Sequence, residues 1–455
     1  MLVAGIDSST QSVKVVLCRA EDGAVVDSAT APHPDGTECH PRHWWEALNK
    51  AYDLLERADA IAVAAQQHGM VALDEDGEVV RPALLWNDTR SAPQARALVG
   101  ELGGAGTWAE RTGSVPVASF TVTKLRWMAE NEPENARRTA SVMLPHDWLT
   151  LRLGADGPVT DRGDASGTGY WSPAEGRYLP ELVTAALGHE PALPRVAGPA
   201  ETVGTTPWGA RLAPGTGDNM GAALGLGLRE GDVAVSIGTS GTAFAVAPAP
   251  AADPSGLVAG FADATGRYLP LVATLNAARI LTSAAALTGT DLDGLSALAL
   301  AAEPGAGGLT LLPYLDGERT PDRPDATGVL SGLTTSNATR ENLARAAVEA
   351  LLCSLADAVD HLAAQGVRPR RTLLIGGGAR SAAVRAIAPA IFGTPVTVPE
   401  PAEYVALGAA RQAAWALAGT LEPPAWPPAP ATEHTAAPAP DIRARYAALR
   451  DTPTR

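Results

Sequence analysis

The stretch "GIDSSTQS", residues 5–12, ends the apolar run "LVAGI" and precedes a second apolar run, "VKVVL". This pattern predicts two strands joined by a turn that carries Asp7, Ser8, Ser9 and Thr10. Short hydroxyl side chains often satisfy the backbone of their own turn, so the stretch alone is typical of an ordinary β-hairpin. That interpretation leaves one feature unexplained, the carboxylate at the tip of a buried strand.

A similar pattern returns in "DVAVSIGTSGTAFAV", residues 232–246. The two copies align Ile6 with Ile237, Asp7 with Gly238, Ser8 with Thr239 and Ser9 with Ser240. A motif repeated near the start of each half predicts an internal duplication into two related domains, each with its own sheet. The period is far too long for a solenoid.

The repeated turns have a shared chemistry. Glycine and small hydroxyl residues let the backbone approach an anion, and consecutive N–H groups of a turn form a concave nest for phosphate oxygens. Two such turns, one of them carrying Asp7, suit a polyphosphate with Mg²⁺. The pair therefore favours phosphate binding over the ordinary hairpin.

Composition narrows the class of protein. The chain has 455 residues, 46% of them hydrophobic and 19% charged, which is typical of a globular enzyme with more than one domain. A net charge of -15 argues against a nucleic-acid partner, and three scattered cysteines indicate a reducing compartment. We find neither a signal peptide before the first strand nor an apolar run of about 18–20 residues. We expect a cytoplasmic protein with no membrane partner.

Strand and helix patterns alternate, which indicates an α/β architecture. In the first half, strands are predicted at residues 61–69, 84–88 and 142–148, and a helix at 43–58. In the second half, a long amphipathic helix at 341–366 is followed by strand, glycine turn and helix at 371–381. From residue 422 the chain is rich in Pro and Ala, which predicts a tail or stiff linker without a core and then a short helix.

Two further segments offer catalytic or binding groups. "GTGDNMGAALGLG", residues 215–227, places Asp218 at the start of a helix, as a cap or as a catalytic carboxylate. The helix dipole should keep Asp218 ionised, so that it can accept a proton from a hydroxyl that attacks phosphorus. "IGGGARS", residues 375–381, is either a crowded turn or a surface for a nucleotide, and it matches neither a Walker A nor a dinucleotide spacing.

At this point an ordered set of motifs can be compared with known families. They are "GIDSSTQS", "QQHG", "LLWNDTR", "LPHDWLTLRL", "TDRGDASGT", "GTGDN", "SIGTSG", "LPYLDGERTP" and "LIGGGARS". Over residues 1–420 the chain resembles the FGGY carbohydrate kinases. The resemblance implies two ribonuclease H-like domains of the actin and sugar kinase type with the active site in an interdomain cleft. Residues 1–229 would bind sugar and supply the catalytic Asp, residues 230–421 would bind ATP, and residues 422–455 would form the Pro/Ala-rich tail.

The resemblance also implies roles for single residues. Asp218 would be the general base for the C5 hydroxyl of D-xylulose, giving D-xylulose 5-phosphate, and Asp7 would act in catalysis by holding Mg²⁺. Gln67 and His68 would contact the sugar. The ATP-binding residues would be Ser9, Thr10, Gly238, Thr239, Ser240, Gly376, Gly377 and Gly378. Homodimers are common among such kinases, which makes a homodimer one possibility, and the sequence leaves the oligomeric state open.

Some assignments stay open at the level of sequence. Gln67 stands where the family usually has Met, which leaves ribulose or another polyol as an alternative substrate. Trp86 and Asp88 either line the sugar end of the cleft or belong to a surface ion pair. Asp161, Asp164 and Ser166 form a structural turn or part of the sugar wall. A non-kinase alternative is an ATP-gated switch on an actin-like fold, which would need no general base.

Overall fold

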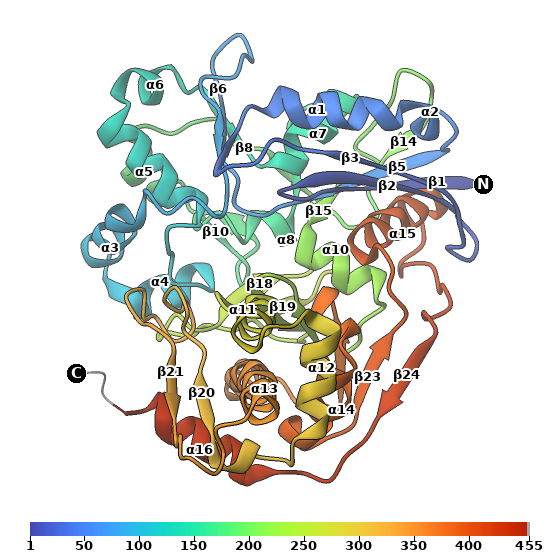
Figure 1. Cartoon of the computed structure of the whole chain (residues 1–455). Helices are drawn as coiled ribbons and strands as arrows, with labels where there is room; N and C mark the ends of the chain where they lie inside the picture. Colours follow the sequence, from blue (N-terminus) through green and yellow to red (C-terminus); the bar gives the residue numbers. More distant parts are fainter. Residues whose placement is uncertain (453–455) are drawn as a thin grey trace. The chain divides into compact units, whose positions relative to one another are not determined.

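The computed structural model describes residues 1–452, and the chain divides into two units (Figure 1). Unit 1 comprises Met1–Leu228, Val246–Pro270 and Ala402–Pro428. Unit 2 comprises Arg229–Ala245, Leu271–Pro401 and the described residues from Ala429 onward. Each unit is built on a sheet of its own, so the predicted two-domain α/β fold is confirmed.

The sheet of unit 1 contains the predicted opening hairpin. Its strands are β1 (Leu2–Ser8), β2 (Ser12–Arg19), β3 (Val25–Pro32), β5 (Ala60–Ala65), β13 (Gly204–Thr205), β14 (Arg211–Leu212) and β15 (Thr216–Gly217). β1 pairs antiparallel with β2, which sets Asp7 opposite Lys14, and parallel with β5. β15 also pairs parallel with β5. The carboxyl ends of three parallel strands therefore meet at one edge, where ligands bind in open α/β sheets.

Short strand pairs and helices surround this sheet. The strand pairs are β4 (Glu38–Cys39) with β7 (Ala83–Leu84), β6 (Val71–Leu73) with β8 (Ser141–Met143), β9 (Val159–Asp161) with β12 (Arg195–Ala197), and β10 (Trp171–Ser172) with β11 (Arg177–Tyr178). Strand β18 (Ala259–Ala262) is instead the edge strand of the second sheet, described below. The helices are α1 (Pro41–Leu48), α2 (Tyr52–Leu55), α3 (Ala92–Glu101), α4 (Gly104–Thr112), α5 (Thr121–Asn131), α6 (Pro133–Arg138), α7 (Pro145–Leu153), α8 (Arg162–Ala165), α9 (Pro180–Leu187), α10 (Asp218–Gly225) and α15 (Tyr404–Ala418).

All three strands predicted in the first half are shorter than expected. The strand predicted at 61–69 ends at Ala65. The strand predicted at 84–88 ends at Leu84. The strand predicted at 142–148 ends at Met143, because Pro145 occupies the first turn of α7. Proline is preorganised for that position and lacks only an N–H that a helix start leaves unpaired. Asp147 then caps the helix by accepting a hydrogen bond from the Leu144 N–H at 2.8 Å.

Helix α15 joins unit 1 from far along the sequence and lies against β1 and β5 (Figure 1). Its alanines pack on small residues of the sheet in one apolar cluster, which includes Val3, Ala60, Ala62, Ala64, Ala406, Ala409 and Ala413. A Cβ on Gly5 would lie 1.9 Å from the Ala406 carbonyl oxygen, so only glycine fits at this position of β1. The glycine that opens "GIDSSTQS" is therefore explained by helix packing.

Unit 2 repeats the arrangement of β1, β2 and β5. Strand β16 (Asp232–Ile237) pairs antiparallel with β17 (Gly241–Ala245) and parallel with β22 (Arg371–Ile375). The sheet continues with β19 (Tyr268–Thr274) beside β17, and with β23 (Val396–Pro399) and β24 (Ala431–His434) beyond β22. A separate pair is β20 (Thr310–Leu312) with β21 (Val329–Ser331). The helices are α11 (Ala278–Thr288), α12 (Leu292–Ala301), α13 (Arg340–Ala364), α14 (Ala382–Phe392) and α16 (Pro440–Arg450), with short 3₁₀ turns η2 (Ala306–Gly308) and η3 (Gly377–Arg380).

The composition of the Pro/Ala-rich segment predicts a tail without a core, but in the structure this segment forms a strand and a helix. β24 pairs antiparallel with β23, and α16 buries Ile442 and Tyr446. Arg443 of α16 donates hydrogen bonds to Asp357 and Asp360 of α13. The composition does not reveal this packing, because two apolar side chains and a few ion pairs are enough to attach a short amphipathic helix to an existing surface.

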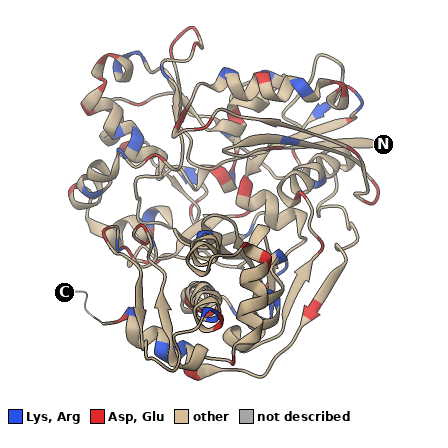
Figure 2. Cartoon of the chain, in the orientation of Figure 1, with Lys and Arg blue, Asp and Glu red and all other residues tan. Residues whose placement is uncertain are grey.

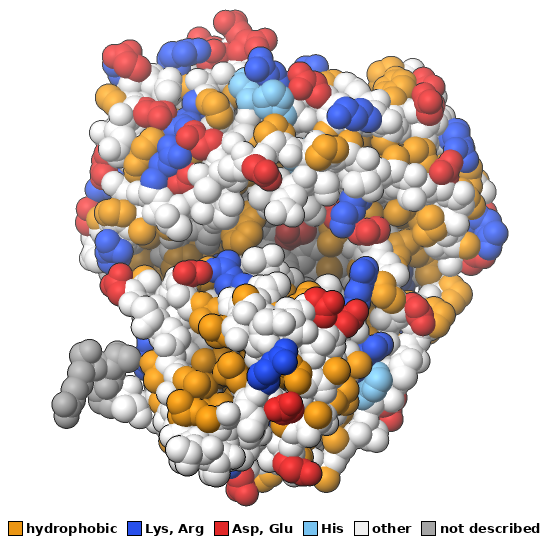
Figure 3. Space-filling model, in the orientation of Figure 1, with side chains coloured by type: hydrophobic (Ala, Val, Ile, Leu, Met, Phe, Trp, Pro, Cys, Tyr) orange, Lys and Arg blue, Asp and Glu red, His pale blue; other side chains and the backbone are white. Residues whose placement is uncertain are grey.

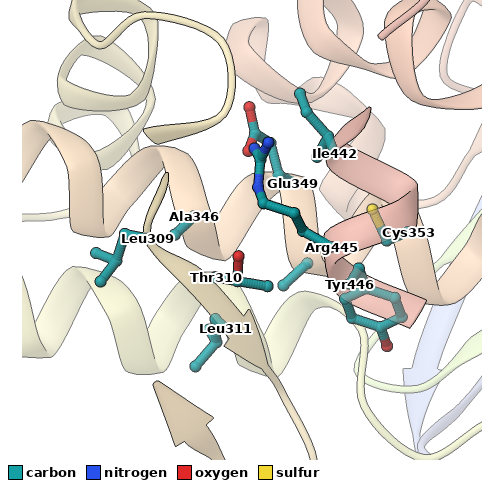
Figure 4. A pocket seen from close by; sticks show the side chains of 10 residues that line it. Leu309, Thr310, Leu311, Ala346, Glu349, Cys353, Ile442, Arg445 and Tyr446 are labelled. Carbon is teal, nitrogen blue, oxygen red and sulfur yellow. The ribbon is translucent and has the colours of Figure 1, made fainter. Parts of the chain in front are cut away.

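A small pocket lies in unit 2 among β20, α13 and α16 (Figure 4). Its wall includes the buried Cys353 and Glu349, and Arg445 from α16. Glu349 is paired with Arg345 at 2.6 Å and accepts a hydrogen bond from the Gly305 N–H. None of the predicted catalytic or binding residues lines this pocket.

Charged side chains of both signs are spread over the described residues (Figure 2). On the face shown in Figure 3, lysines and arginines stand among acidic side chains and form no continuous basic stripe there. Among the helices of residues 1–452, none has the length and apolar character needed to cross a membrane.

Candidate active site

Asp7 lies at the carboxyl end of β1 and is almost completely buried. Its Oδ1 accepts a hydrogen bond from the Ser9 hydroxyl at 2.5 Å. Burial raises the pKa of Asp7 to about 6, although the Ser9 hydroxyl and the charge of Lys14 act in the opposite direction. Lys14 itself is paired with Glu403 at 2.7 Å. A buried carboxylate that is only partly compensated by its neighbours is suited to a cationic partner.

The turn after β1 is held from two sides. The Trp86 indole donates a hydrogen bond to the Thr10 hydroxyl at 2.8 Å. The His33 Nδ1 donates to the Ser9 carbonyl oxygen at 2.9 Å, and its Nε2 is buried with no hydrogen-bond partner among the described residues. Sequence reasoning missed His33, because "APHP" contains no local pattern that separates a site histidine from a structural one. Both contacts keep the turn in a fixed conformation.

Asp218 is the first residue of α10, directly after β15. Burial raises its pKa to about 7, and the charges of Asp7 and Asp164 add to this effect. The expectation that the helix dipole keeps Asp218 ionised is therefore wrong in its direction. The local dipole is outweighed by burial and by two carboxylates that only the tertiary fold brings near. A pKa near neutrality improves a carboxylate as a general base.

Asp218 and Gln67 are joined through Asn219, which sequence reasoning passed over. The Asn219 side-chain amide donates to Asp218 Oδ1 at 2.8 Å and to Gln67 Oε1 at 3.2 Å. Gln67 is buried, and its Nε2 has no hydrogen-bond partner among the described residues. A buried amide donor without a partner costs free energy unless a ligand supplies the acceptor. The sequence signal that could have identified Asn219 is its position directly after Asp218 in "GDN".

His68 follows Gln67 with a left-handed backbone, φ 69°. This conformation is uncommon for a residue with a side chain and often marks a functional site. The His68 Nδ1 lies 2.6 Å from the Gly167 carbonyl oxygen, and the ring packs against Phe120 and Phe261. A Cβ on Gly167 would lie 2.9 Å from the His68 ring and 3.2 Å from Gln67 Nε2. Gly167 thus keeps the space beside both side chains open.

Asp88 lies in a network of ion pairs. Its carboxylate accepts hydrogen bonds from Arg90 and from the Thr37 hydroxyl. Burial opposes its ionisation, yet the hydrogen bonds from Arg90 and Thr37 hold the pKa of Asp88 below its ordinary value. Arg90 also pairs with Glu38 at 2.8 Å. These contacts resemble the ion-pair alternative raised for "WNDTR", and the sugar contact of Asp88 stays a prediction.

In unit 2 the two predicted nucleotide turns are neighbours. Gly238, Thr239 and Ser240 join β16 to β17, and Gly376, Gly377 and Gly378 follow β22, which pairs with β16. A Cβ on Gly378 would lie 2.3 Å from the Ile237 side chain, and Gly376 has φ 86°. The backbone of both turns therefore meets at the ends of adjacent parallel strands, which is a suitable place for phosphate groups.

Comparison with known proteins identifies the family. Residues 2–225 match the N-terminal domain, and residues 233–417 the C-terminal domain, of the FGGY family of carbohydrate kinases. This chain belongs to the FGGY family of carbohydrate kinases. The resemblance seen in the ordered motifs is thereby confirmed, and an FGGY kinase uses ATP as the phosphoryl donor.

Two relatives are similar to this FGGY kinase in sequence over most of its length, and a third shares its fold. It is 50% identical over 436 residues to the xylulose kinase of Streptomyces coelicolor, covering 92% of this chain and 88% of that protein. The crystal structure of xylulose kinase from Bifidobacterium adolescentis is 46% identical, with a TM-score of 0.92 and 99% of each chain covered. Glycerol kinase from Plasmodium falciparum, at 18% identity and a TM-score of 0.87 over 100% of this chain and 99% of that one, shares the fold.

Proposed function

We propose that this FGGY kinase transfers the γ-phosphoryl group of ATP to the C5 hydroxyl of D-xylulose. The observation that carries the proposal is Asp218, a carboxylate of raised pKa connected through Asn219 to Gln67. The 50% identity to a xylulose kinase supports this sugar. A cytoplasmic location and assembly as a homodimer stay predictions.

In the reaction, Asp218 accepts the proton of the C5 hydroxyl as its oxygen attacks the γ-phosphorus. The new O–P bond forms while the bond from the γ-phosphorus to the bridging oxygen breaks, and ADP leaves with that electron pair. Gln67 and His68 orient the sugar, so that the hydroxyl reaches Asp218. Positioning and charge stabilisation account for most of the rate in this class of reaction.

The residues around Asp7 fit a magnesium ion. Mg²⁺ prefers oxygen ligands, and Asp7 offers a buried carboxylate beside the Ser9 hydroxyl. When bound, Mg²⁺ neutralises negative charge on the phosphates of ATP. In unit 1, the backbone N–H groups of Ser9 and Thr10 would bind phosphate oxygens. In unit 2, those of Gly238, Thr239 and Ser240, with the glycines 376–378, would hold the nucleotide.

ATP turnover against a panel of D-xylulose, D-ribulose, L-ribulose, glycerol and gluconate, with a control lacking sugar, tests the proposal. We expect the highest kcat/KM for D-xylulose. Preference for another polyol would keep the kinase and change its substrate. ATP hydrolysis at the same rate with every sugar and with none would instead favour the ATP-gated switch.

The pH dependence of the reaction reports the state of Asp218. Because its pKa lies near 7, Asp218 is increasingly protonated as the pH falls below 7 and can no longer accept the proton. We expect kcat/KM for the sugar to fall about tenfold per pH unit below about pH 7 and to level off above it. Initial rates from pH 5.5 to 8.5 check this, with circular dichroism as the control for folding. A flat profile over a folded protein would contradict it.

Replacing Gln67 by Met tests the unpartnered amide donor. The Gln67 Nε2 is expected to donate to a sugar oxygen, and one such hydrogen bond is worth about 0.5–1.5 kcal/mol. Gln67→Met should therefore raise the KM for D-xylulose about 2- to 13-fold. Gln94→Met, which removes an amide bonded to Glu130, is the control. An unchanged KM would show that Gln67 does not bind the sugar.

A further inference from the structure

Four ionisable side chains form a buried cluster next to Asp218. They are His146, Asp147, Asp161 and Asp164, each at most 2% exposed. The His146 Nδ1 donates to Asp164 Oδ2 at 2.6 Å, and its Nε2 lies 3.1 Å from Asp147 Oδ1. Burial alone would lower the pKa of His146, but the two carboxylates raise it to about 9. The cluster thus places the His146 ring between two carboxyl groups, which favour its protonated form.

One side of the cluster holds the turn that carries Asp218. Asp161 Oδ2 accepts a hydrogen bond from the Thr216 hydroxyl at 2.8 Å. A Cβ on Gly215 would lie 2.6 Å from the His146 ring, so the backbone of the turn rests directly on the imidazole. Thr216 and Gly217 form β15, and Asp218 follows at once. Asp161 and His146 thus contact the turn that leads directly to Asp218.

The other side of the cluster holds His68. Asp161 accepts hydrogen bonds from the Gly163 and Asp164 N–H groups and so caps α8. The Asp164 carbonyl oxygen then accepts a hydrogen bond from the Gly167 N–H at 2.9 Å. The Gly167 carbonyl oxygen in turn accepts the bond from His68 Nδ1. A short chain of hydrogen bonds thus connects the same cluster to a predicted sugar-binding side chain.

Stability alone does not account for such a cluster. A buried ion pair is usually no more stabilising than apolar side chains of similar volume, because desolvation of the charges offsets their attraction. Hydrogen bonds and ion pairs orient side chains more precisely than apolar contacts do, because each bond fixes the angle as well as the distance between its partners.

We propose that Thr216 and His146 are positioning residues for phosphoryl transfer, which hold Asp218 and His68 at a fixed separation through Asp161 and α8. Neither residue touches a reacting atom. The inference rests on the proposed function, because it takes Asp218 as the base and His68 as a sugar contact. It also assigns "LPHDW" and "TDRGDASG" to the support of the site.

The variant Thr216→Val removes the hydroxyl and keeps the shape of the side chain. We expect kcat with D-xylulose to fall about 10- to 100-fold, because a displacement of the base of about 1 Å is enough for such a loss. The KM for D-xylulose should change less than about threefold, since the free energy of ground-state sugar binding is little affected. Thr216→Ser keeps the hydroxyl and should restore kcat to near the wild-type value.

Thr139→Val is the matched control. The Thr139 hydroxyl is equally buried and donates one hydrogen bond of 2.8 Å, to the Asn135 carbonyl oxygen, away from the cluster. We expect a similar loss of Tm in Thr139→Val and Thr216→Val, but an unchanged kcat in Thr139→Val. Asp161→Asn provides a second, isosteric test if Thr216→Val does not fold. Its amide NH2 replaces one of the two carboxylate oxygens that accept from Thr216, Gly163 and Asp164, so at least one of these bonds is lost and a fall in kcat is again expected.

These variants distinguish failure of the positioning role from failure of the proposed function. Wild-type kcat in Thr216→Val and Asp161→Asn would overturn the positioning role and leave the proposed function standing. A wild-type enzyme that does not phosphorylate D-xylulose would refute the proposed substrate, and the same variants measured on the sugar preferred in the panel would then decide the positioning role.

Discussion

Asp218→Asn is expected to lower kcat for sugar phosphorylation by about 10²- to 10⁴-fold, the usual contribution of a general base. Asparagine keeps the oxygen to which Asn219 donates, so the connection to Gln67 should persist and KM should change little. Steady-state kinetics with D-xylulose and ATP measures both constants. Asp156→Asn, at an exposed carboxylate of the same unit, is the control.

The stability of Asp218→Asn separates loss of the base from loss of the fold. The folded-state pKa of about 7 lies above the ordinary value of 3.8, so ionisation of Asp218 is less favourable in the folded chain than in the unfolded one. At pH 8 the neutral side chain should therefore leave Tm unchanged or raise it. A well-folded variant with wild-type turnover would show that Asp218 is not the general base.

Asp7→Asn is expected to lower kcat by about 10²- to 10³-fold, a typical loss when one electrostatic contact to the reacting group is removed. The Ser9 hydroxyl can still donate to the remaining oxygen, so the turn should keep its conformation. Part of the nucleotide affinity should persist, because the other phosphate contacts proposed above are made by backbone N–H groups, which the substitution does not change.

Titration of activity with Mg²⁺ tests this role of Asp7. The variant should need a higher Mg²⁺ concentration than the wild type to reach half of its maximal rate, and calorimetry should still detect ATP binding. Asp76→Asn, at an exposed loop carboxylate, serves as the control. Undiminished activity of Asp7→Asn at low Mg²⁺ would refute the proposed metal contact.

The elements that sequence reasoning placed correctly have local signatures. The hairpins of β1 and β16 have alternating apolar runs around polar turns, and α13 has a long amphipathic repeat. Asp218 at a helix start was also visible, because glycine, aspartate and small residues follow one another there. Such features depend on neighbours in the sequence, so one chain is enough to find them.

The features that sequence reasoning missed depend on contacts between distant residues. His33 meets the Ser9 carbonyl oxygen across 24 positions, and Asn219 meets Gln67 across 152. The pKa of Asp218 was predicted in the wrong direction for the same reason, since Asp7 and Asp164 approach it only in the folded chain. Hydrogen bonds and charge interactions of this kind leave no periodicity in the sequence.

The place of α15 in unit 1 has a consequence for biosynthesis. Val3, Ala60 and Ala62 pack against helix residues that are translated long after Leu228. At about 5–20 residues per second, about 10–40 s pass between the synthesis of Leu228 and that of Ala418. Until α15 has been synthesised, the residues of the sheet that it covers lack this apolar partner. The half of the enzyme that carries Asp218 thus matures late on the ribosome, although most of it is made first.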